Sequence, residues 1–125
     1  MWTYIQSTGQ MFNPAGMMLA QGYSGAGSIG KNNPSLEHLP NVGPIPEGQY
    51  SIGPASDTDT HGPCVMRLTP DPKNEMFGRD GFLIHGDSIE NPGTASEGCI
   101  IMPRFARDAI NTSEDKVLQV LAVAV

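Results

Sequence analysis

Glycine and proline interrupt this chain so often that long regular elements are excluded from most of it. The 15 glycines and 11 prolines make up about a fifth of the 125 residues. This share approaches that of disordered chains, but short apolar runs recur between the turns. We therefore predict a mainly β fold of short strands joined by tight turns. The length suits a single domain over residues 1–125, because one core usually serves about 100–150 residues.

The apolar runs have the length and composition of strands. Trp2 to Gln6 and the Met11-Phe12 pair, separated by the Thr8-Gly9 turn, indicate a hairpin. Further strand-like runs are Met17 to Tyr23, Tyr50 to Ile52, Cys64 to Leu68, Phe82 to His85 and Lys116 to Val125. The last of these is apolar at successive positions, as expected of a central strand that is buried on both sides.

One helix is predicted, and it follows Cys99. Pro103 suits its first turn, apolar residues recur at helical spacing from Phe105 to Ile110, and Asn111 would end it. Gly, Ser and Asn accumulate from Ser24 to Pro34, which predicts a loop.

Charge and hydropathy exclude several partners. A net charge of −6 argues against nucleic-acid binding, which needs clustered Lys and Arg. The sequence contains no run of 18 apolar residues, so we expect no membrane insertion. Near Met1 it also lacks the basic start and apolar stretch of a signal peptide. We expect a chain made in the cytoplasm without a signal peptide.

Cys99 and His85 form the candidate catalytic pair. They are 14 positions apart, enough for a loop to leave a strand and return opposite the histidine. A cysteine needs such a base because only its thiolate attacks. Gly98 is expected to leave backbone N–H groups free to stabilise an oxyanion, and Gly86 to let the chain turn beside His85. A nearby main-chain carbonyl would then hold the imidazole in one tautomer.

For the second cysteine, Cys64, we predict a structural role. Cys64 precedes Val65 and Met66 in a strand-like run, so we expect a small buried side chain rather than a reactive thiol. A zinc site from His61, Cys64, His85 and Cys99 has suitable ligand types, but no close cysteine pair has finger-like spacing. No metal and no cofactor is expected.

The sequence motifs around Cys99 and His85 resemble those of a known family. His85-Gly86 followed by Ser96-Glu97-Gly98-Cys99-Ile100 is similar to the signature of L,D-transpeptidase catalytic domains, as is the segment Gly43 to Tyr50. The compact length, Tyr23-Ser24-Gly25 and Asn32-Asn33-Pro34 resemble a small branch that includes type VI secretion effectors. The resemblance implies a curved sheet or sandwich of short strands with one short helix after the nucleophile.

The resemblance also implies an activity. Members of that branch trim or exchange the terminal D-amino acid of peptidoglycan stem peptides, as L,D-carboxypeptidases or L,D-transpeptidases. The expected partners are the stem peptide, a cognate immunity protein and the secretion machinery, with action in the periplasm of a target bacterium. Ser96, Tyr23, Ser24 and Asn33 are expected to complete the site beside Cys99 and His85.

Two departures from the family pattern bear on the site. Glu97 stands where the family often has a second histidine, and Ile101 where it often has an arginine that binds the substrate carboxylate. Arg104 is the nearest replacement for that arginine. Two alternatives stay open: a non-catalytic module that binds cell wall or a partner protein, and another thiol amidase or peptidase.

Overall fold

The computed structural model describes residues 1–124, which form short strands, one nine-residue helix and two helical segments of three or four residues. In chain order the elements are β1 (Trp2–Ile5), β2 (Gln10–Phe12), β3 (Met18–Gln21), β4 (Tyr23–Ser24), α1 (Gly27–Gly30), the 3-10 helix η1 (Pro34–Leu36), β5 (Gly48–Ile52), β6 (Ser56–Thr58), β7 (Gly62–Pro70), β8 (Leu83–His85), β9 (Ile100–Ile101), α2 (Arg104–Thr112) and β10 (Val117–Leu121).

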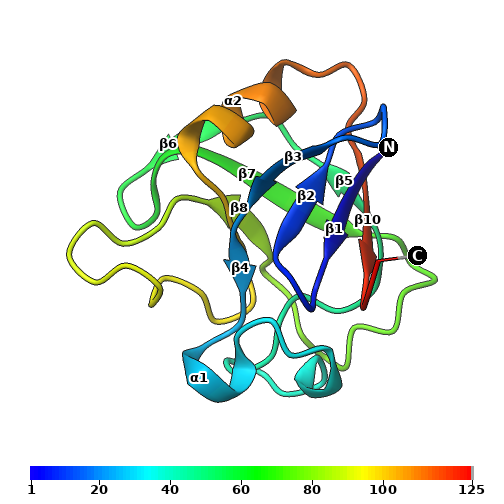
Figure 1. The fold of residues 1–125 in the computed structure, drawn as a ribbon, viewed down its shortest axis with the longest axis vertical. Coiled ribbons are helices and arrows are strands. Elements are labelled where there is room, and N and C mark those ends of the chain that lie inside the picture. Colours follow the sequence, from blue (N-terminus) through cyan, green and yellow to red (C-terminus); the bar gives the residue numbers. More distant parts are fainter. Residues whose placement is uncertain (125) are drawn as a thin grey trace.

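The strands form one mixed sheet in the order β3-β2-β1-β10-β5-β7-β8-β9-β4, with β6 paired to β7 off this path. The first and last strands are parallel neighbours, with Trp2 opposite Leu118 and Ile5 opposite Leu121 (Figure 1). β8 and β9 are also parallel, whereas the other pairs are antiparallel. This order places β8, which ends at His85, side by side with β9, which directly follows Cys99.

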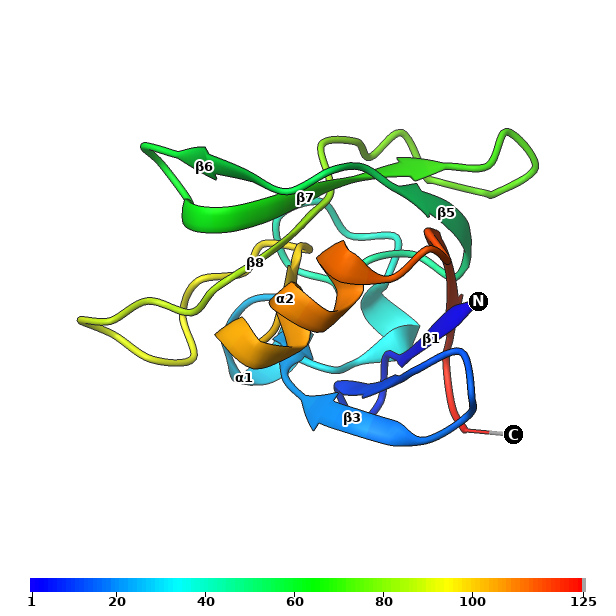
Figure 2. The same ribbon diagram turned by 90° about the horizontal axis from the view of Figure 1, so that it is seen from above.

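The sheet curls around a single apolar core. Figure 2 shows it turning from β3 through β1 to β5 and β7, with α2 inside the curve. Side chains of strands alternate between two faces, so alternate residues such as Leu118 and Val120 of β10 point into the core. From α2, Ala106 and Ile110 complete the core, both fully buried. The helix thereby fixes the segment that follows Cys99.

The predicted fold class is confirmed: the protein is mainly β, with many short strands and one short helix after Cys99. The Trp2 hairpin forms as β1 and β2. The predicted strand from Lys116 to Val125 is shorter, because it ends at Leu121, and its residue Val125 lies outside the described residues. β10 is central, but only alternate residues of it are fully buried.

The helix differs in detail from its prediction. Pro103 caps α2 rather than occupying its first turn, and the helix continues past Asn111 to Thr112. The inward face consists of Ala106, Arg107 and Ile110, which leaves Phe105 59% exposed. The loop predicted between Ser24 and Pro34 contains the single turn α1. None of the helices within residues 1–124 has the length and apolar character needed to cross a bilayer.

Candidate active site

Two adjacent parallel strands position the candidate pair. Ile84 of β8 lies opposite Ile100 of β9, and His85 lies opposite Ile101. Cys99 directly precedes β9 and therefore lies two register positions before the partner of His85. Because side chains of a strand point to the same face at every second position, Cys99 and His85 share one face of the sheet. The loop of residues 86–98 leaves β8 and returns to β9, as the sequence predicted.

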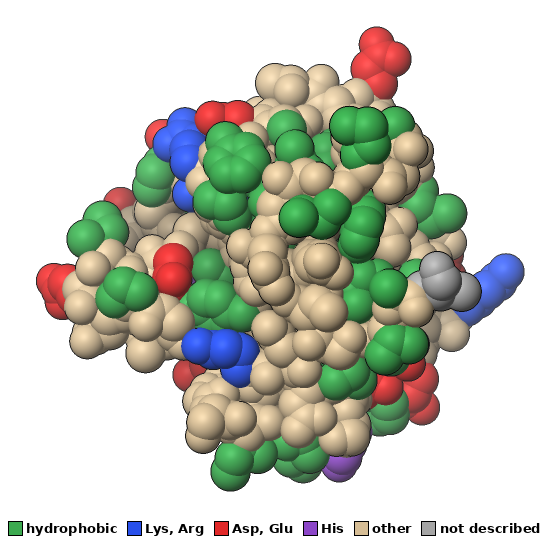
Figure 3. All heavy atoms as spheres, viewed as in Figure 1, with side chains coloured by type: hydrophobic (Ala, Val, Ile, Leu, Met, Phe, Trp, Pro, Cys, Tyr) green, Lys and Arg blue, Asp and Glu red, His purple; other side chains and the backbone are tan. Residues whose placement is uncertain are grey.

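Both side chains open into one cleft of about 1240 Å³. One wall is the tip of the β6–β7 hairpin, including His61, and the other is the 86–98 loop, including Asp87 and Glu90. Figure 2 shows hairpin and loop projecting toward the same side of the molecule. In Figure 3 the loop stands out from the body of the protein and carries acidic side chains. The cleft is thus bounded by two extended segments with the pair at its base.

His85 is held as a neutral base. Its side chain is only 3% exposed, and its Nδ1–H donates to the Gly86 carbonyl at 2.8 Å, the main-chain acceptor that the sequence predicted. This leaves Nε2 as the basic nitrogen. Burial, together with the nearby positive charge of Arg107, lowers the pKa of His85 below its usual range. The imidazole is therefore unprotonated at neutral pH and able to accept a proton.

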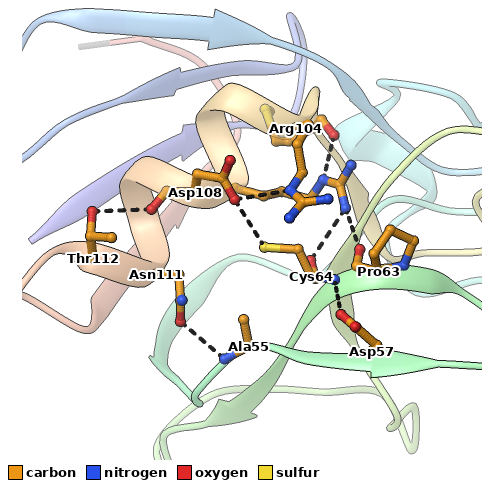
Figure 4. Close-up of polar contacts among 10 residues, drawn as sticks. Ala55, Asp57, Pro63, Cys64, Arg104, Asp108, Asn111 and Thr112 are labelled. Carbon is orange, nitrogen blue, oxygen red and sulfur yellow. Dashed lines mark hydrogen bonds and ion pairs between the residues drawn. The ribbon is translucent and has the colours of Figure 1, made fainter.

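Cys99 is a thiol rather than a preformed thiolate. Burial raises the pKa of Cys99, while a backbone hydrogen bond from Leu83 and the positive charge of Arg79 act in the opposite direction. Both cysteines are free, and Cys64 is buried in β7 as predicted. The Cys64 thiol donates to Asp108 Oδ1 of α2 at 3.6 Å, away from the cleft (Figure 4). A neutral thiol and a neutral imidazole in one cleft need proton transfer before attack.

Arg79 donates to the turn that carries Cys99, and no local sequence signal marked it as part of the site. The residue is 8% exposed, and its guanidinium donates to four backbone carbonyls, those of Glu37, Gly43, Pro44 and Glu97. A side chain at Gly98 would collide with it, because an added Cβ would lie 2.5 Å from Arg79 Nη2. Gly98 also has a φ of +141°. The glycine is therefore required for the packing of Arg79.

Of the backbone N–H groups around the Cys99 thiol, that of Gly98 is already hydrogen-bonded. Its N–H donates to Ser96 Oγ at 3.0 Å, and its carbonyl accepts from Ser24 Oγ at 2.8 Å. Ser96 is buried, donates to the Cys99 carbonyl and accepts from the Gly25 N–H. Outside the strand ladders of residues 1–124, no hydrogen bond recruits the N–H of Cys99 itself. That group is the remaining backbone donor beside the sulfur.

Ser96 and Ser24 therefore support the site without lining the cleft. Ser24 is fully buried, and its hydroxyl also accepts from the Ile45 N–H at 2.9 Å. Together the two serines tie β4 and Gly25 to the turn that carries Cys99. The turn is held by hydrogen bonds from several distant segments, which keeps the thiol in a defined place.

Tyr23 also stabilises the structure around the candidate pair. Its hydroxyl donates to Asp87 Oδ1 at 2.5 Å and accepts from the Ala95 N–H at 2.9 Å. Asp87 begins the 86–98 loop and Ala95 lies near its end, so one phenol holds both sides of the loop together. Asp87 accepts further from Ser88 and Gly93, and these contacts together with Tyr23 hold its pKa below the usual range despite partial desolvation.

Two predicted substrate residues lie outside the cleft. Asn33 caps η1, where its side chain accepts from the Ser35 N–H. Arg104 is exposed on α2 and pairs with Asp108 one turn later at 2.9 Å (Figure 4). Neither side chain reaches the candidate pair, because η1 and the outer face of α2 point elsewhere.

Arg107, three residues further along α2, does line the cleft. It is 7% exposed, and its Nε and Nη1 donate to the carbonyls of Met102, Pro63 and Cys64. Its Nη2 has no hydrogen bond and no acidic partner among residues 1–124, and an added Cβ at Gly86 would lie 2.8 Å from it. A sequence signal existed: Arg107 falls on the same helical stripe as the buried Ala106 and Ile110.

The histidines and cysteines do not assemble a metal centre. Cys64 binds Asp108 beneath α2, whereas His61, His85 and Cys99 face the cleft. Within residues 1–124, no three His, Cys, Asp or Glu side chains are grouped closely enough to hold an ion.

A mainly β protein that presents one cysteine and one buried, neutral histidine from adjacent strands in an open cleft has the elements of a thiol-dependent site. Sequence comparison then places the chain in a family. Residues 19–123 match the Tlde1 domain, and the chain belongs to this family of type VI secretion effectors. Among curated proteins, no sequence matches the chain significantly.

Proposed function

We propose that the chain is a cysteine-dependent acyl transferase that acts on peptidoglycan stem peptides, releasing or exchanging their terminal D-amino acid. The observation that carries this proposal is the shared cleft of Cys99 and His85, with His85 held neutral by burial and oriented by Gly86. Membership of an effector family supports an antibacterial role, and a cell-wall substrate supports action in the periplasm of a target bacterium.

The first half of the reaction forms a thioester. His85 Nε2 accepts the proton of the Cys99 thiol, and the thiolate attacks the carbonyl carbon before the terminal D-amino acid. The N–H of Cys99 donates to the developing oxyanion, since the N–H of Gly98 is already bonded to Ser96. The C–N bond then breaks, and protonated His85 returns its proton to the departing amine.

The second half releases the acyl group. Water or the amine of another D-amino acid enters the cleft, and His85 accepts its proton as it attacks the thioester. The C–S bond then breaks, and His85 returns the proton to the Cys99 sulfur. Water gives hydrolysis, and an amine gives exchange. The cleft is open between hairpin and loop, which leaves room for either nucleophile once the first amine has left.

Arg107 is our candidate for binding the substrate carboxylate. Sequence resemblance suggested Arg104, but that side chain is paired with Asp108 outside the cleft. Arg107 offers a buried guanidinium with an unbonded Nη2 beside Gly86. A buried cation without an acidic partner attracts a carboxylate strongly.

This assignment predicts a selective loss in Arg107→Gln. For a peptide with a free terminal carboxylate, kcat/KM should fall roughly 10- to 100-fold, the value of a charge-assisted hydrogen bond. For the same peptide with an amidated terminus, kcat/KM should change little. This comparison separates the loss of carboxylate binding from any loosening of the fold. Arg104→Gln is the matched control and should retain the preference for the free acid. Equal losses for both peptides in Arg107→Gln would contradict the assignment.

The overall proposal is tested with purified cell-wall fragments analysed by mass spectrometry. We expect the protein to remove one terminal D-amino acid from stem peptides, or to replace it when another D-amino acid is added. The Cys64→Ala variant should do the same, because its thiol lies beneath α2. Cleavage at another bond would identify a different thiol amidase, and binding without turnover would identify a non-catalytic module.

A further inference from the structure

A second histidine lies against His85. His61 is in the turn between β6 and β7, and its imidazole is tilted by 49° to that of His85 with the ring centroids 4.7 Å apart. His61 is exposed, whereas His85 is buried, and both line the cleft. The turn that carries His61 is ordered locally, since the His61 N–H donates to Thr58 Oγ1 at 2.9 Å.

We propose that His61 is a positioning residue of the active site, which packs on the imidazole of His85 and sets the electrostatic surroundings of that base. The proposal rests on the proposed function only in treating His85 as the base. His61 comes from the opposite wall of the cleft, so the β6–β7 hairpin becomes part of the catalytic arrangement. A proton on His61 repels a proton on His85 at this separation.

The other groups around His85 show why a further positive charge matters. Arg107 of α2 repels a proton on His85, whereas Asp87 and the Gly86 carbonyl, which follow β8, favour one. Burial adds to the effect of Arg107 and lowers the pKa of His85, and His61 acts in the same direction. A protonated His85 cannot accept the thiol proton, so a lower pKa keeps the base competent in more acidic solution.

The three histidines of the chain allow a direct test without substrate. In an NMR titration of the imidazole signals, His61→Phe keeps a ring against His85 but removes its charge. We expect the titration midpoint of His85 to rise by about half a pH unit, the effect of one solvent-screened charge at this distance. Raising the salt concentration should reduce the difference between wild type and variant.

His38→Phe is the matched control, because His38 lies near Phe77 and does not line the cleft. It should leave the His85 midpoint unchanged. His61→Ala removes both ring and charge, and should raise the midpoint and broaden the His85 signals through loss of packing. An unchanged His85 midpoint in both His61 variants would overturn the proposal. Failure to cleave peptidoglycan would instead reject the proposed function, and the titration result would stand.

Discussion

Replacing Cys99 with alanine is expected to abolish the toxicity of the chain when it is fused to an export signal and produced in a bacterium. The wild-type fusion should cause swelling or lysis, because its proposed substrate lies outside the inner membrane. Without the sulfur no thioester forms, so turnover of wall fragments should fall by at least about a thousandfold, as in other enzymes that lose their nucleophile. Growth curves and microscopy measure the first effect, and mass spectrometry the second.

Cys64→Ala is the matched control for this experiment. Its thiol is buried and bonded to Asp108, so the exported variant should remain toxic. Wild-type protein kept in the cytoplasm should be harmless. Toxicity that persists there, or that survives the loss of Cys99, would reject the cell-wall proposal in favour of a binding module or another target.

The second large effect is expected in stability. Arg79→Met keeps an apolar stem but leaves four backbone carbonyls without their donor. Unsatisfied buried acceptors are costly, so the free energy of unfolding should fall by about 3 kcal/mol or more. For a chain of this length this lowers the thermal midpoint by roughly 10 °C. Calorimetry or thermal circular dichroism measures the change.

A comparison with an exposed arginine isolates the cause. Arg104→Met removes a solvent-exposed partner of Asp108 and should leave the midpoint essentially unchanged. If Arg79→Met were equally harmless, the carbonyl cluster would not depend on the guanidinium. In the folded fraction of Arg79→Met, Cys99 should also react more slowly with alkylating reagents, because a charge that lowers its pKa is gone.

The candidate pair was accessible from the sequence because each residue sits in a local motif. His85 ends an apolar run and precedes Gly86, and Cys99 follows Gly98 and precedes another apolar pair. Loop length allows the two residues to meet, and the resemblance of both motifs to the L,D-transpeptidase signature singled them out as a pair. A nearby main-chain carbonyl was expected to hold the imidazole, and the structure identifies it as that of Gly86.

The surrounding residues could not be found in this way. Arg79 acts on carbonyls that are 18 to 42 positions away in the chain, and His61 reaches His85 through the pairing of β6, β7 and β8. Ser24 and Asn33 belong to segments that resemble the family, but Ser24 donates to the Gly98 carbonyl of the Cys99 turn and Asn33 accepts from the backbone of η1. Nothing in the local sequence distinguishes these outcomes.

The sequence by itself determined the short strands, the helix after Cys99 and the Cys99–His85 pair, because turn residues, side-chain periodicity and motifs act over a few neighbouring positions. Only the tertiary structure decided which arginine faces the cleft, which N–H stays available beside the sulfur and which histidine covers the base. Those choices depend on how the sheet curls around α2, so that Arg107 points inward and Arg104 outward. Three steps along a helix leave two side chains about 60° apart around its axis, and the packing of the core decides which of them lies inside.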